Sequence, residues 1–447
     1  MAAAALPLVR GFSPGAAFAY RDRRAVAVED FLRDAAQLAG MLPERRYILN
    51  LCTDRYRFAV GFAAALLRGQ VSLLPPNETP DVIDRLASQY PDMYCLNDQA
   101  RTPGSLPAMS FPDRLASDKA LARVPEVPAA QVAAIVFTSG STGQPLPHPK
   151  TWGSLVGVAL AEIEILQLRT RPGLALVGTV PPQHVFGLEA TVLMVMQGGF
   201  ALHAGRPFYP ADIKAELAAL PRPRGLVIAP AHLRVLLAEP EDLPPADFLL
   251  CATSPLSPEL AAQAEACFAT QLHEIYGCTE SGGIASRRTS ATSEWRAMAG
   301  VTLRTDDQGT WVRGGHVEDE VALADVIELR GGGRFLLHGR TADLVNIAGK
   351  RTSLAHLNYH LNSIDRVRDG VFVVPEQHGE AVTRLTAYVV APGLSKEALL
   401  KALRQRIDSA FLPRPLHFVD RLPRNATGKL PREALVELQS GLARKTG

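Results

Sequence analysis

The sequence predicts an α/β protein with a large N-terminal domain of layered α/β subdomains, a small β-meander, and a smaller α+β C-terminal domain. Three observations lead to this prediction. Segments with helical hydrophobic periodicity alternate with short apolar segments between residues 31 and 268. After Val301 the pattern changes to short strands and Gly-rich turns. Beyond Asp343 a shorter stretch again mixes helices and strands.

In the first part of the chain we expect helices at residues 31–41, 58–68 and 80–89, and strands at 47–51 and 71–74. Residues 101–131 are rich in Pro, Ser and charged side chains, so we expect a long surface connection there. This connection leads into a strand at residues 132–137, whose apolar and β-branched side chains suit a buried position.

The second part continues the alternation. The expected strands lie at residues 175–179, 225–229 and 248–252, with helices at 211–220 and 259–268. In the C-terminal domain we expect helices at 355–364 and 396–407 and strands at 371–374, 385–390 and 416–419. An antiparallel meander is expected between these two parts.

Composition narrows the class of protein. The chain has 447 residues, of which 47% are hydrophobic and 21% charged, as in globular proteins with a large core. A net charge of +2 argues against nucleic acid as the main partner. The apolar runs are too short for a membrane span, the five cysteines show no disulfide or zinc spacing, and the N-terminus lacks a secretory signal pattern. We therefore expect a cytoplasmic protein.

The most informative segment follows the strand at 132–137. It consists of small and hydroxylated residues that end shortly before Lys150, namely Thr138, Ser139, Gly140, Ser141, Thr142 and Gly143. Backbone N–H groups and hydroxyls in such a loop suit phosphate oxygens, and a nearby Lys supplies positive charge. The segment does not have the Walker P-loop spacing. Taken alone, it is equally consistent with a flexible surface loop.

Three further motifs stand downstream. They are Tyr276-Gly277-Cys278-Thr279-Glu280, then Asp325 with Gly339-Arg340 starting fourteen residues later, then Asn425-Ala426-Thr427-Gly428-Lys429. Together with the phosphate loop, these motifs resemble those of the adenylate-forming superfamily. This superfamily comprises acyl-CoA synthetases, acyl-carrier-protein ligases, peptide-synthetase adenylation domains and luciferases. The resemblance runs from about Val132 to the C-terminus. The variant with His148 and Lys150 is similar to bacterial ligases of aryl-polyene and xanthomonadin-type pigment clusters.

The resemblance implies ATP and Mg²⁺ as cofactors and assigns a role to each motif residue. The β- and γ-phosphates would contact the loop Thr138, Ser139, Gly140, Ser141, Thr142 and Gly143, with Lys150 nearby. The rest of the nucleotide would contact Ser254 and the 276–277 segment (Tyr276, Gly277), Thr279 at the α-phosphate, Asp325 at the ribose hydroxyls and Arg340. Glu280 resembles the Mg²⁺ ligand, and a carboxylate suits this hard cation. His184 would border the acyl pocket, and it is counted with Thr279, Glu280 and Lys429 as catalytic.

The resemblance also divides the chain into an N-terminal domain, residues 1–339, and a mobile lid, residues 340–447. Lys429 would contact the reacting carboxylate and the α-phosphate, and Gly349 would line the pantetheine tunnel after the lid rotates. The chain departs from the family pattern in two places. Prolines replace the usual Pro-Lys-Gly ending of the phosphate loop, and Ala342 stands at the hinge pivot.

The implied activity joins a carboxylic acid to AMP with release of pyrophosphate and then transfers the acyl group to CoA or an acyl carrier protein. Residues 184–195 are largely apolar, and we expect no acidic partner there for a substrate ammonium. This favours an aromatic, hydroxybenzoate-like acid or a fatty acid. Two alternatives remain: a free-standing amino-acid adenylation domain, and a non-catalytic nucleotide-binding relative. The joint presence of Glu280, Asp325, Arg340 and Lys429 weighs against the second.

Overall fold

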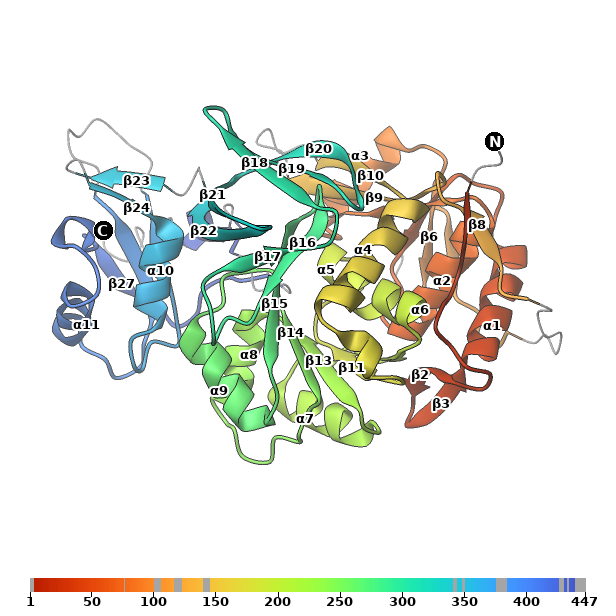
Figure 1. Cartoon of the computed structure of the whole chain (residues 1–447), viewed down its shortest axis with the longest axis horizontal. Coiled ribbons are helices and arrows are strands. Elements are labelled where there is room, and N and C mark those ends of the chain that lie inside the picture. The colour runs from red at the N-terminus through yellow and green to blue at the C-terminus, as the bar shows by residue number, and fades with distance from the viewer. Residues whose placement is uncertain are drawn as a thin grey trace.

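The computed structural model describes residues 4–75, 77–99, 106–115, 123–139, 145–340, 344–347, 350–374, 384–425, 430–431 and 434–438. A large α/β part is followed by a smaller C-terminal part that lies at one end of the molecule (Figure 1). Among the described residues, no helix combines the length and the apolar character that crossing a membrane requires.

The large part contains two sheets that are mainly parallel. The smaller sheet has six strands in the order β10 (Pro145–Thr151), β9 (Val132–Ser139), β5 (Val71–Leu74), β4 (Tyr47–Asn50), β6 (Met93–Asn97) and β7 (Ala108–Ser110). All its neighbouring strands are parallel except β9 and β10, which are antiparallel. Strand β10 therefore forms an edge of this sheet, directly after the phosphate-loop segment.

The larger sheet has eleven strands. Their order is β21 (Asp325–Gly331), β22 (Arg334–Arg340), β17 (Trp295–Ala297), β16 (Gly282–Arg287), β15 (Leu272–Cys278), β14 (Phe248–Cys251), β13 (Arg224–Ile228), β11 (Ala175–Gly178), β12 (Ala201–His203), β2 (Ala17–Arg21) and β3 (Arg24–Ala27). Neighbouring strands are parallel from β15 to β2 and antiparallel toward both ends of the sheet.

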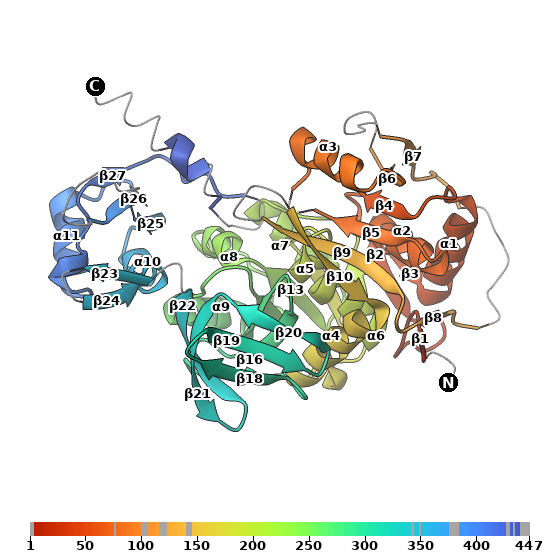
Figure 2. The ribbon, with the colours of Figure 1, turned by 90° about the horizontal axis from the view of Figure 1, so that it is seen from above.

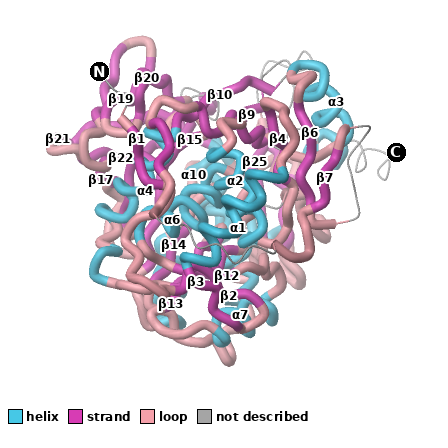
Figure 3. Tube along the Cα trace, turned by 90° about the vertical axis from the view of Figure 1, so that its right-hand side faces the viewer, coloured by secondary structure: helices cyan, strands magenta, loops and turns pink. Residues whose placement is uncertain are grey.

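Helices form three layers around the two sheets. The middle layer, between the sheets, contains α1 (Val28–Met41), α2 (Arg55–Leu67), α4 (Trp152–Ile165) and α6 (Met194–Gly198) (Figure 3). Helix α3 (Pro80–Gln89) covers the outer face of the six-stranded sheet. The outer face of the larger sheet is covered by α7 (Pro210–Ala219), α8 (Pro230–Leu237) and α9 (Pro258–Phe268).

The sequence of the middle layer explains its position. Helix α2 contacts β4 and β5 of one sheet and β12 of the other. Its residues from Phe58 to Leu66 are apolar on all sides and buried, as expected of a helix enclosed by two sheets. The side chain of Asp54 caps this helix by accepting a hydrogen bond from the Arg57 backbone N–H, 2.9 Å away.

The remaining strands form small sheets. A three-stranded meander consists of β18 (Thr302–Asp306), β19 (Gly309–Gly314) and β20 (Val317–Leu323), and β1 (Ala5–Pro7) pairs with β8 (Glu126–Pro128). The C-terminal part contains β23 (Leu344–Ile347), β24 (Lys350–Ser353), α10 (Leu354–Asn362), β25 (Asp369–Val373), β26 (Thr386–Val390), α11 (Lys396–Arg404) and β27 (Leu416–Phe418). Short helical turns are η1 (Leu168–Thr170), α5 (Val185–Leu188), η2 (Glu189–Leu193) and η4 (Ser409–Phe411).

The C-terminal part has a hydrophobic core of its own, which includes Leu357 and Phe372. In Figure 2 it stands beside α8 and α9. The Tyr359 hydroxyl of α10 donates a hydrogen bond to the Glu259 carboxylate of α9, with an O–O distance of 3.0 Å. A separate core joined by few polar contacts is the expected anatomy of a domain that folds as a unit.

The predicted fold class is confirmed, and each predicted helix and strand is present with its ends shifted by a few residues. Three short strands were not predicted. Residues 145–151 form an edge strand although three of them are prolines, and the connection at 101–131 contains the strands β7 and β8. The domain boundary at residues 339 and 340 stays a prediction.

Candidate active site

Two of the sequence motifs meet at one end of the larger sheet. The Tyr276 hydroxyl on β15 donates a hydrogen bond to the Asp325 carboxylate at the start of β21, with an O–Oδ2 distance of 2.9 Å. The Tyr276 ring packs against the rings of Trp295 and Phe335, with centroids 5.4 and 5.8 Å away. These aromatic contacts orient the hydroxyl, so motifs 49 residues apart form one polar site.

The spacing between Asp325 and the Gly339-Arg340 pair is that of a β-hairpin. Strands β21 and β22 are antiparallel, and Asp325 lies directly opposite Arg340. The two residues therefore stand at the same end of the hairpin. The Arg340 side chain lies outside the described atoms, so its contact with a nucleotide stays a prediction.

The turn between β15 and β16 carries Thr279 and Glu280, both half-buried. Gly277 makes this turn possible, because a Cβ atom at that position would lie 2.1 Å from the Gly282 carbonyl oxygen. The structure thus explains why the motif contains Gly277 and places Thr279 and Glu280 next to the Tyr276–Asp325 pair in the chain.

Strand β10 carries the segment that replaces the usual end of the phosphate loop. Side chains alternate between the two faces of a strand, so Pro147 and Pro149 share one face and His148 and Lys150 share the other. Both basic side chains therefore lie on the same side of the sheet edge.

Both basic side chains reach the sequence motifs. The Nε2 atom of His148 lies 2.9 Å from the Thr138 hydroxyl and 3.7 Å from a Glu280 carboxylate oxygen. The Lys150 ammonium donates a hydrogen bond to the Glu280 backbone carbonyl. Burial lowers the pKa of His148 although Glu280 opposes this, so the imidazole is neutral at pH 7. Thr138, Lys150 and Glu280 are thus brought together, and His148 joins them.

The predicted adenine segment follows β14. Ser254 is half-buried, and the preceding Thr253 has a backbone φ of +87°, a conformation that non-glycine residues rarely adopt. The Ser257 hydroxyl accepts a hydrogen bond from the Leu260 N–H, 3.1 Å away, and so caps helix α9. A strained residue between a strand and a capped helix fixes the path of the segment that contains Ser254.

His184 stands at the N-terminal end of α5, which continues directly into the π-helical turn η2. Gly187 is required there, because a Cβ atom would lie 1.9 Å from the Pro181 carbonyl oxygen. The buried Arg55 guanidinium donates hydrogen bonds to the Thr191 hydroxyl in η2 and to the Gly178 carbonyl at the end of β11, over 2.5 and 2.7 Å. Wide helical turns of this kind are frequent at functional sites.

Two buried carboxyl groups, one on α4 and one in η2, were not predicted from the sequence. Glu162 on α4 is 0% exposed and Glu189 in η2 is 4% exposed. The expectation that residues 184–195 carry no acidic partner is therefore wrong, since Glu189 lies there. The burial of Glu162 could have been predicted from the sequence of α4, because Leu155, Ala159 and Glu162 follow one another at helical spacing on one buried face.

These carboxyl groups converge on the start of β16. The Gly283 N–H donates a hydrogen bond to Glu189, with an N–Oε2 distance of 3.2 Å. A Cβ atom on Gly283 would lie 2.7 Å from a Glu162 oxygen. Burial, opposed by Lys150, raises the pKa of Glu189 to about 7. Burial together with Glu189 raises the pKa of Glu162 well above its ordinary value. Burial also lowers the pKa of nearby His316 to about 4, so this ring is neutral.

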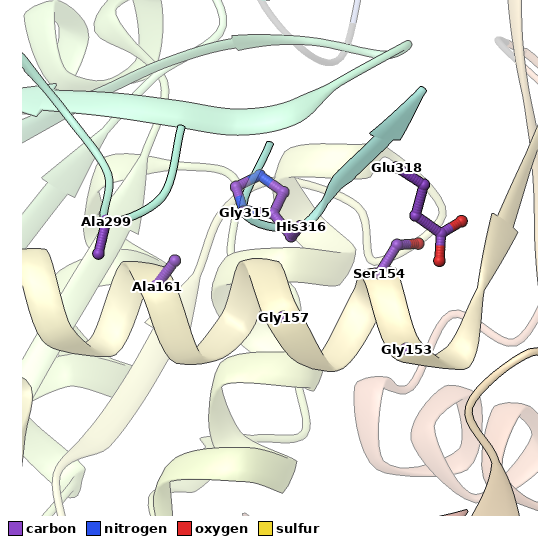
Figure 4. A pocket seen from close by; sticks show the side chains of 8 residues that line it. All are labelled: Gly153, Ser154, Gly157, Ala161, Ala299, Gly315, His316 and Glu318. Atoms are coloured by element: carbon purple, nitrogen blue, oxygen red, sulfur yellow. The ribbon is translucent and has the colours of Figure 1, made fainter. Parts of the chain in front are cut away.

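A cavity of about 250 Å³ lies beside α4 (Figure 4). It lies between the small residues Gly153, Gly157 and Ala161 of α4 and the Gly315–His316 turn before β20. It does not contain the motif residues, so it is separate from the site formed by Tyr276, Asp325 and Glu280.

Several predicted site residues lie outside the described part of the chain. They are Gly140, Ser141, Thr142, Gly143, Ala342, Gly349 and Lys429, together with the side chain of Ser139. The segment just before Lys429 is described. There the Arg424 guanidinium forms a two-pronged ion pair with Asp369 on β25, with both N–O distances 2.7 Å. This pair anchors the start of the motif on the C-terminal sheet.

Within the described ranges, no group of three or more His, Cys, Asp or Glu side chains could hold a metal ion. Mg²⁺ bound with a nucleotide needs few protein ligands, because phosphate oxygens and water supply the others. The Glu280 carboxylate is 33% exposed and lies on the motif turn beside Thr138 and His148. These residues therefore fit a nucleotide-bound Mg²⁺, with Glu280 as the protein ligand.

Known proteins are similar to this chain in sequence and in fold. The chain is 29% identical to the 4-coumarate–CoA ligase of Rhodobacter capsulatus, over 66% of this chain and 74% of that protein. It is 26% identical to the indoleacetate–CoA ligase of Aromatoleum aromaticum, over 74% of this chain and 71% of that protein. ATP-bound MatB of Rhodopseudomonas palustris has the same fold, with a TM-score of 0.82, 18% identity and 97% of each chain covered.

Two sequence families match consecutive parts of the chain. Residues 42–310 match the family described as AMP-binding enzyme. Residues 361–429 match its C-terminal domain family, described as AMP-binding enzyme C-terminal domain. The first match alone covers more than half of the 447 residues. The chain therefore belongs to the AMP-binding enzyme family.

Proposed function

We propose that this protein is an AMP-forming acid–thiol ligase that activates a small carboxylic acid with ATP. A carboxylate oxygen of the acid attacks the α-phosphorus of ATP, the bond to the leaving oxygen breaks, and pyrophosphate departs. A thiol sulfur of CoA or of a phosphopantetheine carrier then attacks the acyl carbon. AMP leaves, and the thiol proton passes to solvent.

The observation that carries this proposal is the hydrogen bond between Tyr276 and Asp325. It joins two motifs that the resemblance assigns to one nucleotide, and the turn with Thr279 and Glu280 lies directly beyond Tyr276. We assign the ribose hydroxyls to Asp325, since a carboxylate accepts two hydrogen bonds at once. The names of the relatives, both CoA ligases of aromatic acids, support the same reaction class and an aromatic acid.

Charge builds on the phosphate oxygens during adenylation, so the site must supply aligned donors and positive charge. We assign this role to Thr138, Thr279 and Lys429. When bound, Mg²⁺ would neutralise phosphate charge. The lid, residues 340–447, would bring Lys429 to the reacting carboxylate and later bring Gly349 to the thiol.

Pyrophosphate release tests this proposal. The purified protein is mixed with ATP, Mg²⁺ and a panel of benzoates, cinnamates, fatty acids and amino acids. CoA or a holo acyl carrier protein is then added to identify the acceptor. We expect acid-dependent release with aromatic acids and thioester formation with one of the two thiols. ATP binding without release for any acid would instead favour a non-catalytic nucleotide-binding protein, and release with amino acids alone would favour an amino-acid adenylation domain.

A further inference from the structure

The carboxyl group of Glu162 has no partner that explains its burial. Neither of its oxygens has a hydrogen-bond partner among the described residues, and the side chain is 0% exposed. A buried polar group without a partner costs free energy, and apolar side chains of similar volume usually pack at lower cost. A carboxyl group kept in this position therefore needs a reason outside the packing of the chain.

Its position indicates the reason. Glu189 follows directly on the segment that begins with His184, which the sequence analysis places beside the acyl group. Gly282 and Gly283, which both carboxyl groups approach, follow directly on the turn that carries Glu280. The carboxyl pair thus lies where the predicted acyl segment and the nucleotide motif converge. A Cβ atom at Gly282 would lie 2.6 Å from a Glu189 oxygen, and one at Gly283 would lie 2.7 Å from a Glu162 oxygen, so the two glycines keep side chains away from the pair.

The charges around the pair determine what it can bind. Lys150 acts on Glu189 and binds the Glu280 carbonyl, and the Glu280 and Glu318 carboxylates also act on its ammonium. His316, which also faces this region, is neutral at pH 7. Burial favours the protonated form of both carboxyl groups, and Lys150 favours the ionised form of Glu189. The oxygens can accept hydrogen bonds from a ligand, and Lys150 already supplies a positive charge at the site, so we expect a neutral donor to fit better than a cationic one.

We propose that Glu162 and Glu189 form the polar end of the acyl pocket and select carboxylic acids with a neutral hydrogen-bond donor, a hydroxyl or aromatic amino group, remote from the reacting carboxylate. This inference rests on the proposed acid activation and deepens it. The two residues determine specificity and take no part in bond making. A site that is built to pair with a donor rejects an analogue without the donor, because its own buried oxygens are then left unpaired.

Matched pairs of acids test the inference. The specificity constant for pyrophosphate release is measured with benzoate, 4-hydroxybenzoate, 4-aminobenzoate and 4-(aminomethyl)benzoate, and with cinnamate and 4-hydroxycinnamate. We expect the wild-type protein to prefer an acid with a neutral donor over its unsubstituted partner by about tenfold or more. The acid with a charged aminomethyl group should be a poor substrate.

Variants of Glu162 test whether this residue causes the preference for acids with a neutral donor. Glu162→Leu should bring the ratio between hydroxylated and unsubstituted acid close to one, and Glu162→Gln, which keeps an acceptor, should retain part of it. Both acids are compared on the same sample, so any misfolded fraction cancels from the ratio. Glu164→Gln is the matched control, because Glu164 stands two residues away on α4 and is 65% exposed. It should keep the wild-type ratio.

Some outcomes would contradict the role of Glu162 and Glu189, and others would contradict the proposed acid activation. An unchanged ratio in Glu162→Leu, a wild-type preference for unsubstituted acids, or a preference for the charged aminomethyl acid would overturn the inference while leaving acid activation intact. Should Glu162→Leu fail to fold, the wild-type ratios and those of Glu162→Gln still decide it. Absence of pyrophosphate release with every acid would instead contradict the proposed function.

Discussion

Two regions of the candidate site differ in how their polar groups are hydrogen-bonded. We call the region of Tyr276, Asp325, Thr138 and His148 the nucleotide end, and the region of Glu162 and Glu189 the acyl end. At the nucleotide end, the buried Tyr276 bonds to Asp325 and His148 lies within hydrogen-bond distance of Thr138, so these polar groups are paired within the protein. At the acyl end, the fully buried Glu162 has no hydrogen-bond partner among the described residues. We expect the paired groups to contact the nucleotide and the unpaired carboxyl group to contact the acid.

The two ends should therefore respond differently to mutation. Changes at the nucleotide end should reduce the reaction with every acid to the same extent. Changes at the acyl end should alter the ratio of the activities with different acids. They should also alter the stability of the protein. The following experiments separate the two behaviours.

The largest effect is expected at Lys429. Lys429→Ala should reduce adenylation by about two to three orders of magnitude, the typical cost of removing one preorganised electrostatic contact at a transition state. The same loss is expected for every acid, measured as pyrophosphate release. Transfer of a chemically prepared acyl-adenylate to the thiol should persist.

Gly349→Leu is expected to show the reverse pattern, with adenylate formed and thioester formation blocked, because a side chain would obstruct the thiol tunnel. Lys401→Ala, an exposed lysine of α11, serves as the control. Equal loss of both half-reactions in both variants would rule out separate lid faces for the two steps.

A smaller effect is expected at Asp325. Asp325→Ala should weaken ATP binding by about 1–3 kcal/mol, because the ribose hydroxyls lose a charged acceptor. Tyr276→Phe removes the 2.9 Å hydrogen bond to Asp325 but keeps the carboxylate, so it should cost less. Both are measured as the dissociation constant of ATP by calorimetry, with the exposed Asp319→Ala as control. Wild-type ATP affinity in Asp325→Ala would show that the motif was assigned wrongly.

At the acyl end we expect an effect on stability that depends on pH. A carboxyl group whose pKa is raised on folding stabilises the folded state below its ordinary pKa, and this contribution is lost as pH rises through the raised value, about 7 for Glu189. The free energy of unfolding should therefore fall between pH 5 and pH 8. In Glu162→Gln it should fall less, because the contribution of Glu162, whose pKa burial raises, is removed.

Urea unfolding of the wild-type protein and of Glu162→Gln at several pH values measures this difference. Glu164→Gln should follow the wild-type curve, since Glu164 is exposed on the same helix. Parallel curves for wild type and Glu162→Gln would show that Glu162 is not held in the protonated, buried state that its surroundings predict.

The smallest effect is expected at His148. His148→Phe keeps a ring of similar shape but removes the contact with the Thr138 hydroxyl, which is worth about 0.5–1.5 kcal/mol if it is a typical hydrogen bond. The KM for ATP should rise accordingly, to the same extent with every acid. His338→Phe, an exposed histidine of β22, is the control. An effect that differs between acids would place His148 at the acyl end instead.

Tyr276 and Asp325, which the structure brings together, could be selected from the sequence because both lie in short motifs. Tyr276 and Asp325 are each identified by immediate neighbours and by spacing, and a hairpin turns that spacing into proximity. Residues without such a motif were missed. Glu162 stands two positions from the exposed Glu164, and only the helical period of α4 distinguishes the buried carboxyl from the exposed one.

The strand that follows the phosphate loop was not predicted from the sequence. Three prolines within residues 145–151 are typical of a loop, but proline is also tolerated on a sheet edge, where its missing N–H faces away from the neighbouring strand. Which of the two occurs depends on whether β9 offers a partner, and this depends on contacts that the local sequence does not contain.

The same edge strand has a consequence for how molecules of this protein meet. An unprotected sheet edge invites the strand of another chain to extend the sheet, which is a common route to aggregation. The outer rim of β10 offers no N–H donor at Pro145, Pro147 or Pro149, so an incoming strand would find alternate hydrogen bonds missing along its length. The prolines thus allow this edge to remain exposed without pairing with a strand of another molecule.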